Sequence, residues 1–384
     1  MKNEISVIFT GDIGFDKYMD KKWEDEELIS KELLDFFYSA DHTVANVEGP
    51  MVGDDAVYEN RLLSHSMSKE ASVVLRRIKA DFWNICNNHI FDCGSMGIAE
   101  TIKEAEKCNA RAFGAGKNIY DAAAPVYIEG AGGIGMFSVG YRRGCKGATQ
   151  NDPGCLNWNE TDIIRENIKK IKEKCRWCVI VSHGGEEFTS LPMPYTRQRY
   201  LSFLEMGADA VVCHHPHVPM NYEKAGGKYI FYSLGNFIFD TDYQRAQFNT
   251  EKGVLLKLIF TENEIKFDAV GVKIDRECEK IKKSELPDIF TSVPETEYNL
   301  LLPLAAKAFV EATKRQCVFM RPDEFKDATD KKWEEEFLNP KRSGRVQGEA
   351  LDFFIVCPLA EKYGNGEWKK SSLEKVKKYI SEQI

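Results

Sequence analysis

The sequence predicts a layered α/β fold, because short β-rich segments alternate with segments of helical periodicity. In the first hundred or so residues the expected strands are 5–10, 43–47 and 81–86, and the expected helices are 26–38, 68–78 and 95–108. Polar residues follow each of these strands, so side chains suited to binding or chemistry are expected to gather at one edge of the sheet.

The middle of the chain continues the same pattern of strands and helices. Expected strands lie at residues 126–129, 134–139, 178–182, 210–213, 229–234, 253–260 and 265–274, with helices at 161–174 and 196–206. From residue 279 onward, lysine, glutamate and helical periodicity dominate. We therefore predict an α/β domain over residues 1–278 and a mostly helical C-terminal extension or subdomain over residues 279–384.

The composition bounds the class of protein. The 384 residues are 43% hydrophobic and 29% charged, which is ordinary for a globular protein with a sizeable core. A net charge of −8 argues against a general nucleic-acid binder, which needs a basic face. The eleven scattered cysteines fit a reducing compartment, and the sequence shows neither a signal region nor a membrane-spanning stretch. We expect a cytoplasmic protein without a nucleic-acid partner or direct membrane insertion.

The densest chemical signal is a cluster of three histidines, His214, His215 and His217, that directly follows the apolar run 210–213. Neutral imidazole is the commonest metal ligand, and a loop after a buried strand can turn two imidazoles toward one point. The alternative is that one histidine is hydrogen-bonded in the core and the others are solvated. The cluster alone leaves the two interpretations about equal.

Other strand ends carry matching groups. Five of them together deliver Asp12, Asn46, Glu48, Asn88, His89, His183, Glu187, His215 and His217. This set is rich in carboxylate, amide and imidazole and contains no cysteine, which favours a divalent ion such as Mn, Zn, Fe or Mg, one or two in number. Two ions bridged by a carboxylate are a recurrent device for hydrolysis, because a bound metal lowers the pKa of the attacking water.

Several sequence blocks in this order carry a family resemblance. They are Gly11-Asp12, the run 45–50, Asn87-Asn88-His89, His183 with Glu187, the run 214–218 and the run 232–237. Together they resemble the capsule-synthesis CapA family of the poly-γ-glutamate biosynthesis type, whose domain looks like a variant of the calcineurin-like metallophosphoesterase fold. The resemblance covers about two-thirds of the chain. It implies an α-β-β-α sandwich of metallophosphoesterase type.

The resemblance also implies roles for individual residues. Asp12 takes the place of the first metal-binding aspartate, and Glu48 that of the bridging carboxylate. Asn88 corresponds to a ligand of the second metal, and His89 to the acid or substrate clamp. The remaining implied metal ligands are His183, His215 and His217.

The chain departs from the usual family pattern at four positions, one of which is Met220, where a glutamine is common. Gly14 stands where the parent fold has a histidine in its first Asp-x-His, so one metal position is expected to be weakened or empty. Glu48 is one methylene longer than an aspartate. Gly184 replaces the tryptophan that is usual in the family.

Some assignments have structural alternatives. Asn88 is also a common turn residue, and Glu187 fits a catalytic role and a helix cap equally well. Asp92 either caps the following helix or orients His89, and we favour orientation and a place in the catalytic set. The remaining candidates for contact with an anionic substrate are Asn46, Arg142 and Asn236, although a solvated Arg142 and a tight turn at Asn236 are at least as plausible.

Two functions follow from these observations. The first is a metal-dependent hydrolase of a phosphoester or γ-glutamyl amide, with His89 donating a proton to the leaving group, in capsule, poly-γ-glutamate or related polysaccharide metabolism. The second is a non-catalytic component of capsule assembly that binds polymer or a protein partner. The missing histidine at Gly14 motivates this second function, because a site with a weakened metal position can bind without turnover. The expected ligands are an anionic polymer or phosphoester.

Overall fold

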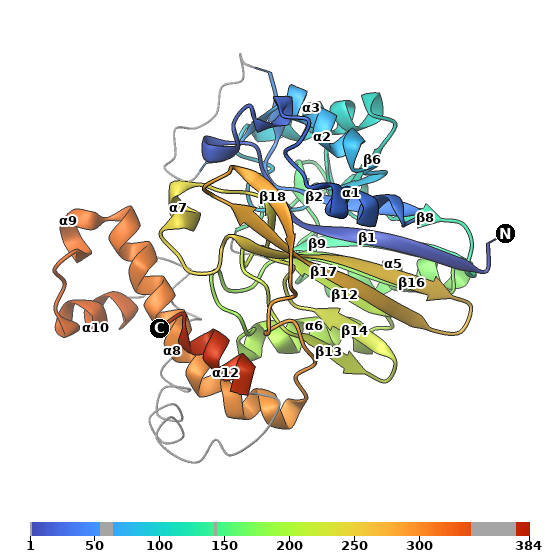
Figure 1. The fold of residues 1–384 in the computed structure, drawn as a ribbon. Helices are drawn as coiled ribbons and strands as arrows, with labels where there is room; N and C mark the ends of the chain where they lie inside the picture. Colours follow the sequence, from blue (N-terminus) through green and yellow to red (C-terminus); the bar gives the residue numbers. More distant parts are fainter. Residues whose placement is uncertain (1, 54–63, 142–143, 339–373) are drawn as a thin grey trace.

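A computed structural model describes residues 2–53, 64–141, 144–338 and 374–384 (Figure 1). Its first sheet has eight strands in the order β18-β17-β16-β1-β2-β5-β6, with β15 pairing with β1 off this path. Their bounds are β1 Glu4–Ile13, β2 His42–Val47, β5 Phe82–Asn84, β6 Arg111–Phe113, β15 Asn236–Ile238, β16 Lys252–Thr261, β17 Ile265–Asp275 and β18 Lys280–Ser284. The strands β1, β2, β5 and β6 run parallel, and β16 to β18 extend the sheet in antiparallel fashion.

The second sheet has six strands in the order β13-β14-β12-β11-β9-β8. Their bounds are β8 Val126–Ile128, β9 Ile134–Gly140, β11 Trp177–His183, β12 Ala210–His214, β13 Tyr222–Ala225 and β14 Lys228–Phe231. The four central strands are parallel, and β8 and β13 are antiparallel edges. Two further pairs of two-residue strands are β3 Met51–Val52 with β4 Met67–Ser68, and β7 Ala115–Gly116 with β10 Gly154–Cys155.

Helices cover the outer faces of both sheets. Their bounds are α1 Lys31–Tyr38, α2 Ser72–Arg77, α3 Gly94–Lys107, α4 Ile119–Ala122, α5 Thr161–Lys174, α6 Pro194–Glu205 and α7 Asp242–Arg245. Single 3-10 turns lie at η1 Lys17–Met19, η2 Lys22–Glu24 and η3 Lys69–Ala71. Toward the C-terminus follow α8 Glu295–Met320, α9 Pro322–Phe325, α10 Asp330–Leu338 and α12 Glu374–Ser381, with α9 and α10 at one edge of the molecule (Figure 1).

Alternating side chains divide the core into layers. Val7 and Phe9 of β1 point into a buried cluster shared with Val179 and Val181 of β11, which therefore lies between the two sheets. Strand residues of opposite orientation, such as Ile8, contribute to a second cluster with residues of the covering helices. The predicted α-β-β-α sandwich is therefore confirmed, because each sheet packs one face on the other sheet and one on helices.

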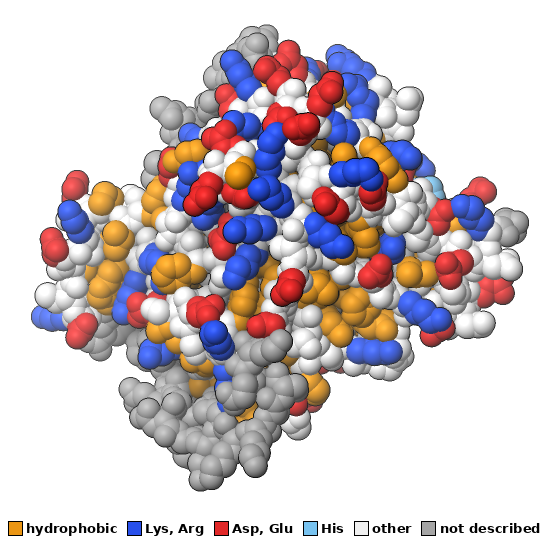
Figure 2. All heavy atoms as spheres, in the orientation of Figure 1, with side chains coloured by type: hydrophobic (Ala, Val, Ile, Leu, Met, Phe, Trp, Pro, Cys, Tyr) orange, Lys and Arg blue, Asp and Glu red, His pale blue; other side chains and the backbone are white. Residues whose placement is uncertain are grey.

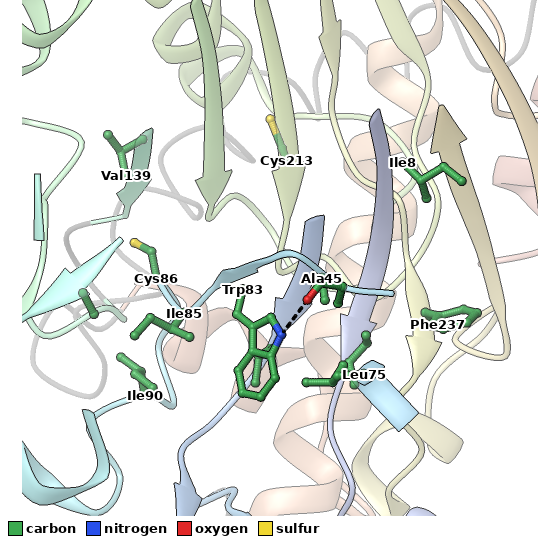
Figure 3. Packing of buried hydrophobic residues seen from close by; sticks show 14 of the residues in the cluster. Ile8, Ala45, Leu75, Trp83, Ile85, Cys86, Ile90, Val139, Cys213 and Phe237 are labelled. Atoms are coloured by element: carbon green, nitrogen blue, oxygen red, sulfur yellow. Dashed lines mark hydrogen bonds between the residues drawn. The ribbon is translucent and has the colours of Figure 1, made fainter. Parts of the chain in front are cut away.

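Figure 3 shows part of the outer cluster around Trp83 of β5. The Trp83 side chain is fully buried next to Ile85 and Leu75, and its indole N–H donates to the carbonyl of Ala80 at 3.3 Å. This bond satisfies the polar atom of a large apolar side chain, as burial requires. The cluster fixes the end of β5, from which Asn87, Asn88 and His89 follow.

One expected helix is shorter than the periodicity of residues 26–38 predicts. The helix α1 begins at Lys31, because residues 28–30 pair with β18 instead of coiling. The backbone N–H of Ile281 donates to Leu28, the N–H of Ser30 donates to Ile281, and Ile29 forms a parallel bridge with Ile281. Pairing with a strand about 250 residues away thus overrides the local helical pattern.

The division of the chain into two domains at residue 278 stays a prediction.

The charges on the surface and the polarity of the helices bear on contact with nucleic acid or a membrane. On the face in Figure 2, Lys and Arg side chains are intermixed with Asp and Glu. Among the described residues, every helix is too short or too polar to cross a lipid bilayer.

Candidate metal centre

A row of polar side chains crosses three parallel strands at the edge where they end. The register pairs Asp12 of β1 with Asn46 of β2, and Asn46 with Asn84 of β5. The Asn84 amide donates to Asn46 Oδ1 at 2.6 Å, and the Asn46 amide donates to Asp12 Oδ1 at 2.8 Å. All three side chains are buried. This ladder fixes the orientation of the Asp12 carboxylate.

Glu48 lies at the centre of two groups of potential ligands. One group is Glu48, His183 and His215, and the other is Asp12, Glu48 and His217. In each group one ligand atom per residue lies within 4.8 Å of the others. Glu48 Oε1 is 3.8 Å from His183 Nε2 and 3.6 Å from His217 Nε2. The carboxylate of Glu48 therefore joins the two groups.

The backbone after β12 is strained where it presents these histidines. His215 has φ of +100° and His217 has φ of +58°, a region that side-chain-bearing residues rarely occupy. Phe188, which stacks against the His217 ring at 5.9 Å, has φ of +62°. Such strain persists where the surroundings hold it, and it is concentrated at functional sites.

Electrostatics differ between the members of the site. Burial would raise the pKa of Asp12, but His214 and His217 outweigh it and hold the pKa well below its ordinary value. Burial raises the pKa of Glu48 well above its ordinary value, helped by the charge of Asp12. Burial would lower the pKa of His217, but Glu48 and Asp12 outweigh it and raise the pKa to about 10. Burial and the neighbouring His215 lower the pKa of His183.

The His183 side of the site includes Asn88 and an aromatic ring. His183 Nε2 lies 2.7 Å from Asn88 Oδ1, so the two predicted ligands are adjacent although β5 and β11 belong to different sheets. The ring of Tyr141 packs on His215 with centroids 4.7 Å apart. A Cβ at Gly184 would lie 2.8 Å from the ring of Trp158, which therefore occupies space beside the position where the family usually has a tryptophan.

His89 Nδ1 lies 2.8 Å from Oδ2 of Asp92, the carboxylate expected to orient it. His65 also belongs to this neighbourhood, because its ring centroid lies 4.2 Å from that of His89 and its backbone N–H donates to Asp92. His65 Nδ1 in turn contacts Asp16 Oδ2 at 2.5 Å. The local sequence around His65 gives no signal, because the contact arises from packing of separate segments. Burial, then the charges of His65 and His217, lowers the pKa of His89.

His214 also lies closer to the site than the sequence suggested. The Nδ1 atom of His214 is 3.6 Å from Oδ1 of Asp12, and the Nδ1 atom of His217 is 3.2 Å from Oδ2. The two histidines therefore contact different oxygens of the same carboxylate. The place of His214 directly next to His215 was a usable signal for membership of the site.

The Gly14 departure has a structural counterpart. A Cβ at Gly14 would come within 2.3 Å of the Phe239 ring, so Phe239 occupies the space beside this position. That ring stacks on His217 at 5.0 Å with 5° between the planes. An aromatic ring thus packs where the parent fold has a histidine.

The predicted substrate contacts have mixed placements. Asn236 is buried, with Oδ1 3.0 Å from His217 Nδ1 and its amide donating to Thr250 at 2.9 Å. Asn46 has both ends of its amide bonded within the ladder. Arg142 lies outside the described residues. Glu187 reaches the site, with Oε1 3.6 Å from His215 Nε2. The substrate-binding roles stay predictions.

The donor set fits a divalent ion. Both oxygens of Glu48, Oδ2 of Asp12 and Nδ1 of His183 are buried and have no hydrogen-bond partner among the described residues. Buried polar atoms without partners are costly unless something satisfies them. Carboxylate and imidazole ligands suit Zn, Mn or Fe, and the set contains no thiolate. These buried groups could therefore hold a metal ion.

Comparison with known proteins places the chain in a family. The model of the family described as bacterial capsule synthesis protein PGA_cap matches residues 6–241, which include the strand ends of the site. The chain belongs to this capsule synthesis family. The resemblance inferred from the sequence blocks is thereby confirmed.

Named relatives support the same assignment. The chain is 30% identical over 249 residues to the PGA biosynthesis protein CapA of Bacillus subtilis (strain 168), covering 63% of this chain and 65% of that protein. It is 27% identical over 262 residues to the capsule biosynthesis protein CapA of Bacillus anthracis, covering 64% and 62%. The chain thus spans less than two-thirds of the length of these relatives. A solved structure of a hypothetical protein from Thermus thermophilus aligns over 70% of this chain and 99% of that one, with a TM-score of 0.43 and 15% identity, too distant to add to the argument.

Proposed function

We propose that this member of the capsule synthesis family is a metal-dependent hydrolase of a phosphoester or γ-glutamyl amide, acting in capsule, poly-γ-glutamate or related polysaccharide metabolism. The observation that carries the proposal is the buried Glu48 carboxylate shared by two groups of ligands. When bound, a divalent ion there would stabilise negative charge on the substrate and lower the pKa of a water. The proposed holders are Asp12, Glu48, Asn88, His183, His215 and His217.

The chain's own residues would orient and protonate the substrate. His89 is held by Asp92 through Nδ1, which leaves Nε2 for the leaving group. Burial keeps the substrate-free imidazole neutral, and an anionic substrate beside it would favour the protonated form that can donate. Glu187 would complete this set from the His215 side.

Turnover tests the proposal directly. The purified full chain is stripped of metal, reloaded with Mn²⁺ and assayed on a generic phosphodiester and on poly-γ-glutamate. We expect metal-dependent hydrolysis of one of them and a loss of about 10²–10⁴-fold in His89→Ala, the range for general acid–base groups. His42→Ala, at the start of β2 away from the site, is the matched control. Hydrolysis that survives without metal or without His89 would contradict the proposal.

The second candidate is a non-catalytic component of capsule assembly that binds an anionic polymer or a protein partner. The packing of Phe239 against Gly14 favours it, because that position lacks the histidine of the parent fold. Metal binding and polymer binding without turnover of either substrate would select this function over hydrolysis.

The cellular location is part of the proposal. The ten cysteines that the structure describes are free thiols, in keeping with the cytoplasmic location that we propose. Fractionation of cells that express the natural gene tests it, and recovery of the protein outside the cytoplasm would contradict it.

A further inference from the structure

The loop that carries Glu187, between β11 and α6, is covered by the helix α8. Leu191 of this loop belongs to the same buried cluster as Leu301 of α8. Tyr298 of α8 donates its hydroxyl to the carbonyl of Pro192 at 2.8 Å. The helix therefore holds the loop in place by apolar packing and a buried hydrogen bond.

Closer to the site, a series of packed aromatic rings connects α8 with His217 of the metal centre. Phe319 of α8 packs on Tyr243 of α7 with centroids 5.3 Å apart, and Tyr243 packs on Phe188 at 5.2 Å. Phe188 stacks against the ring of His217 at 5.9 Å. Ala312 of α8 completes this small buried cluster.

The same helix also makes a polar contact with Glu187. The Gln316 amide donates to Glu187 Oε2 at 2.7 Å, and the Tyr243 hydroxyl donates to the same oxygen at 2.9 Å. The other carboxylate oxygen, Oε1, is the one 3.6 Å from His215 Nε2. The two hydrogen bonds to Oε2 hold the Glu187 side chain in one rotamer. They offset the conformational entropy that this side chain loses when it is fixed.

We propose that Gln316 is a positioning residue of the metal centre, which acts by holding the Glu187 carboxylate against His215. The inference rests on the proposed function of that centre as a metal site. It assigns a role to α8, which lies wholly outside residues 6–241 matched by the family model. In this chain, the helix α8 thus contacts the site through the Glu187 side chain.

The test uses the full chain with Gln316→Leu, which keeps the bulk of the side chain and removes the donor. Partners that orient a metal ligand typically contribute 10–100-fold to affinity, so we expect Mn²⁺ binding measured by calorimetry to weaken by about tenfold. Asn299→Leu, an exposed amide on the same helix, is the matched control and should bind as the wild type does.

A double-variant cycle separates positioning from a general effect on packing. If Gln316 acts through Glu187, then Gln316→Leu should cause no further loss in a Glu187→Ala background. An equal loss in both backgrounds would show that α8 acts by another route and would overturn the inference. Wild-type affinity in Gln316→Leu would overturn it as well.

A measurement without metal keeps the inference separate from the proposed function. In metal-free protein with labelled histidine, the imidazole resonances of His215 should shift in Gln316→Leu and in the same direction in Glu187→Ala, while those of His42 stay unchanged. A wild type that binds no metal sinks the proposed function, and unshifted His215 resonances sink the positioning role whatever the metal result.

Discussion

The Asp12–His217 half of the site and the His183–His215 half differ in what holds their side chains. In the first half, Asp12 is bonded along the Asn46–Asn84 ladder, and His217 is contacted by Asn236 of β15. These supports belong to one sheet. In the second half, Glu187 beside His215 is held by Tyr243 and by Gln316 of α8.

This difference shows two ways of fixing a buried ligand. Strand register positions Asp12 in the first half, because parallel pairing places Asp12, Asn46 and Asn84 in one row. The second half depends on a helix more than a hundred residues further along the chain. We therefore expect loss of the Gln316 contact to affect His215, and changes at the sheet edge to affect Asp12 and His217.

The largest expected effect comes from the residue that both halves share. Glu48→Gln removes the common charge, and we expect metal binding in both halves to fall by more than about 100-fold, as loss of a ligand exceeds the 10–100-fold loss of an outer partner. Elemental analysis of the dialysed protein measures it.

The matched control is Glu264→Gln, at an exposed turn between β16 and β17. Retention of one metal per chain in Glu48→Gln would show that the two halves are independent sites that do not share this carboxylate.

Gly14→Ala perturbs the first half alone. Its Cβ would lie 2.3 Å from the Phe239 ring, which stacks on His217, so overpacking should cost about 1–3 kcal/mol of unfolding free energy. Chemical denaturation measures this loss. Gly147→Ala, where the nearest atom is 3.9 Å away, is the control. Adding Phe239→Leu should recover part of the stability, and a strictly additive pair would contradict the packing argument.

Proton release distinguishes His217 from His183. The pKa of His217 is raised to about 10, so the metal-free imidazole is protonated at pH 7, and only its neutral form can bind a metal. Binding should therefore release at least one proton and strengthen with pH by up to about tenfold per unit below pH 10. Calorimetry in two buffers of different ionisation enthalpy counts the protons. Binding without proton release at pH 7 would place the metal away from His217.

The smallest expected effect is at Asn236. Asn236→Ala removes the partner of His217 Nδ1, and we expect metal affinity to fall by about tenfold, at the low end for orienting groups. The effect should add to that of Gln316→Leu, because the two residues act on different halves. Strong coupling between them in a double-variant cycle would show that the halves move together.

The resemblance to the capsule synthesis family implied the α-β-β-α sandwich. The residues by themselves predicted a layered α/β fold and which strand ends carry Asp12, Glu48, His183, His215 and His217. They could do so because strand periodicity, loop position and residue chemistry are local properties. The sequence also marked Gly14 as a departure, although it gave no indication that Phe239 would pack against it.

Tertiary structure alone decided the rest. The start of α1 was set by pairing with β18, the neighbourhood of His89 was completed by His65, and Glu187 accepts a hydrogen bond from Gln316. Each of these contacts joins segments far apart in the chain and involves residue types that have many other uses. No local pattern predicts such a contact, because its free energy exists only after the layers have packed.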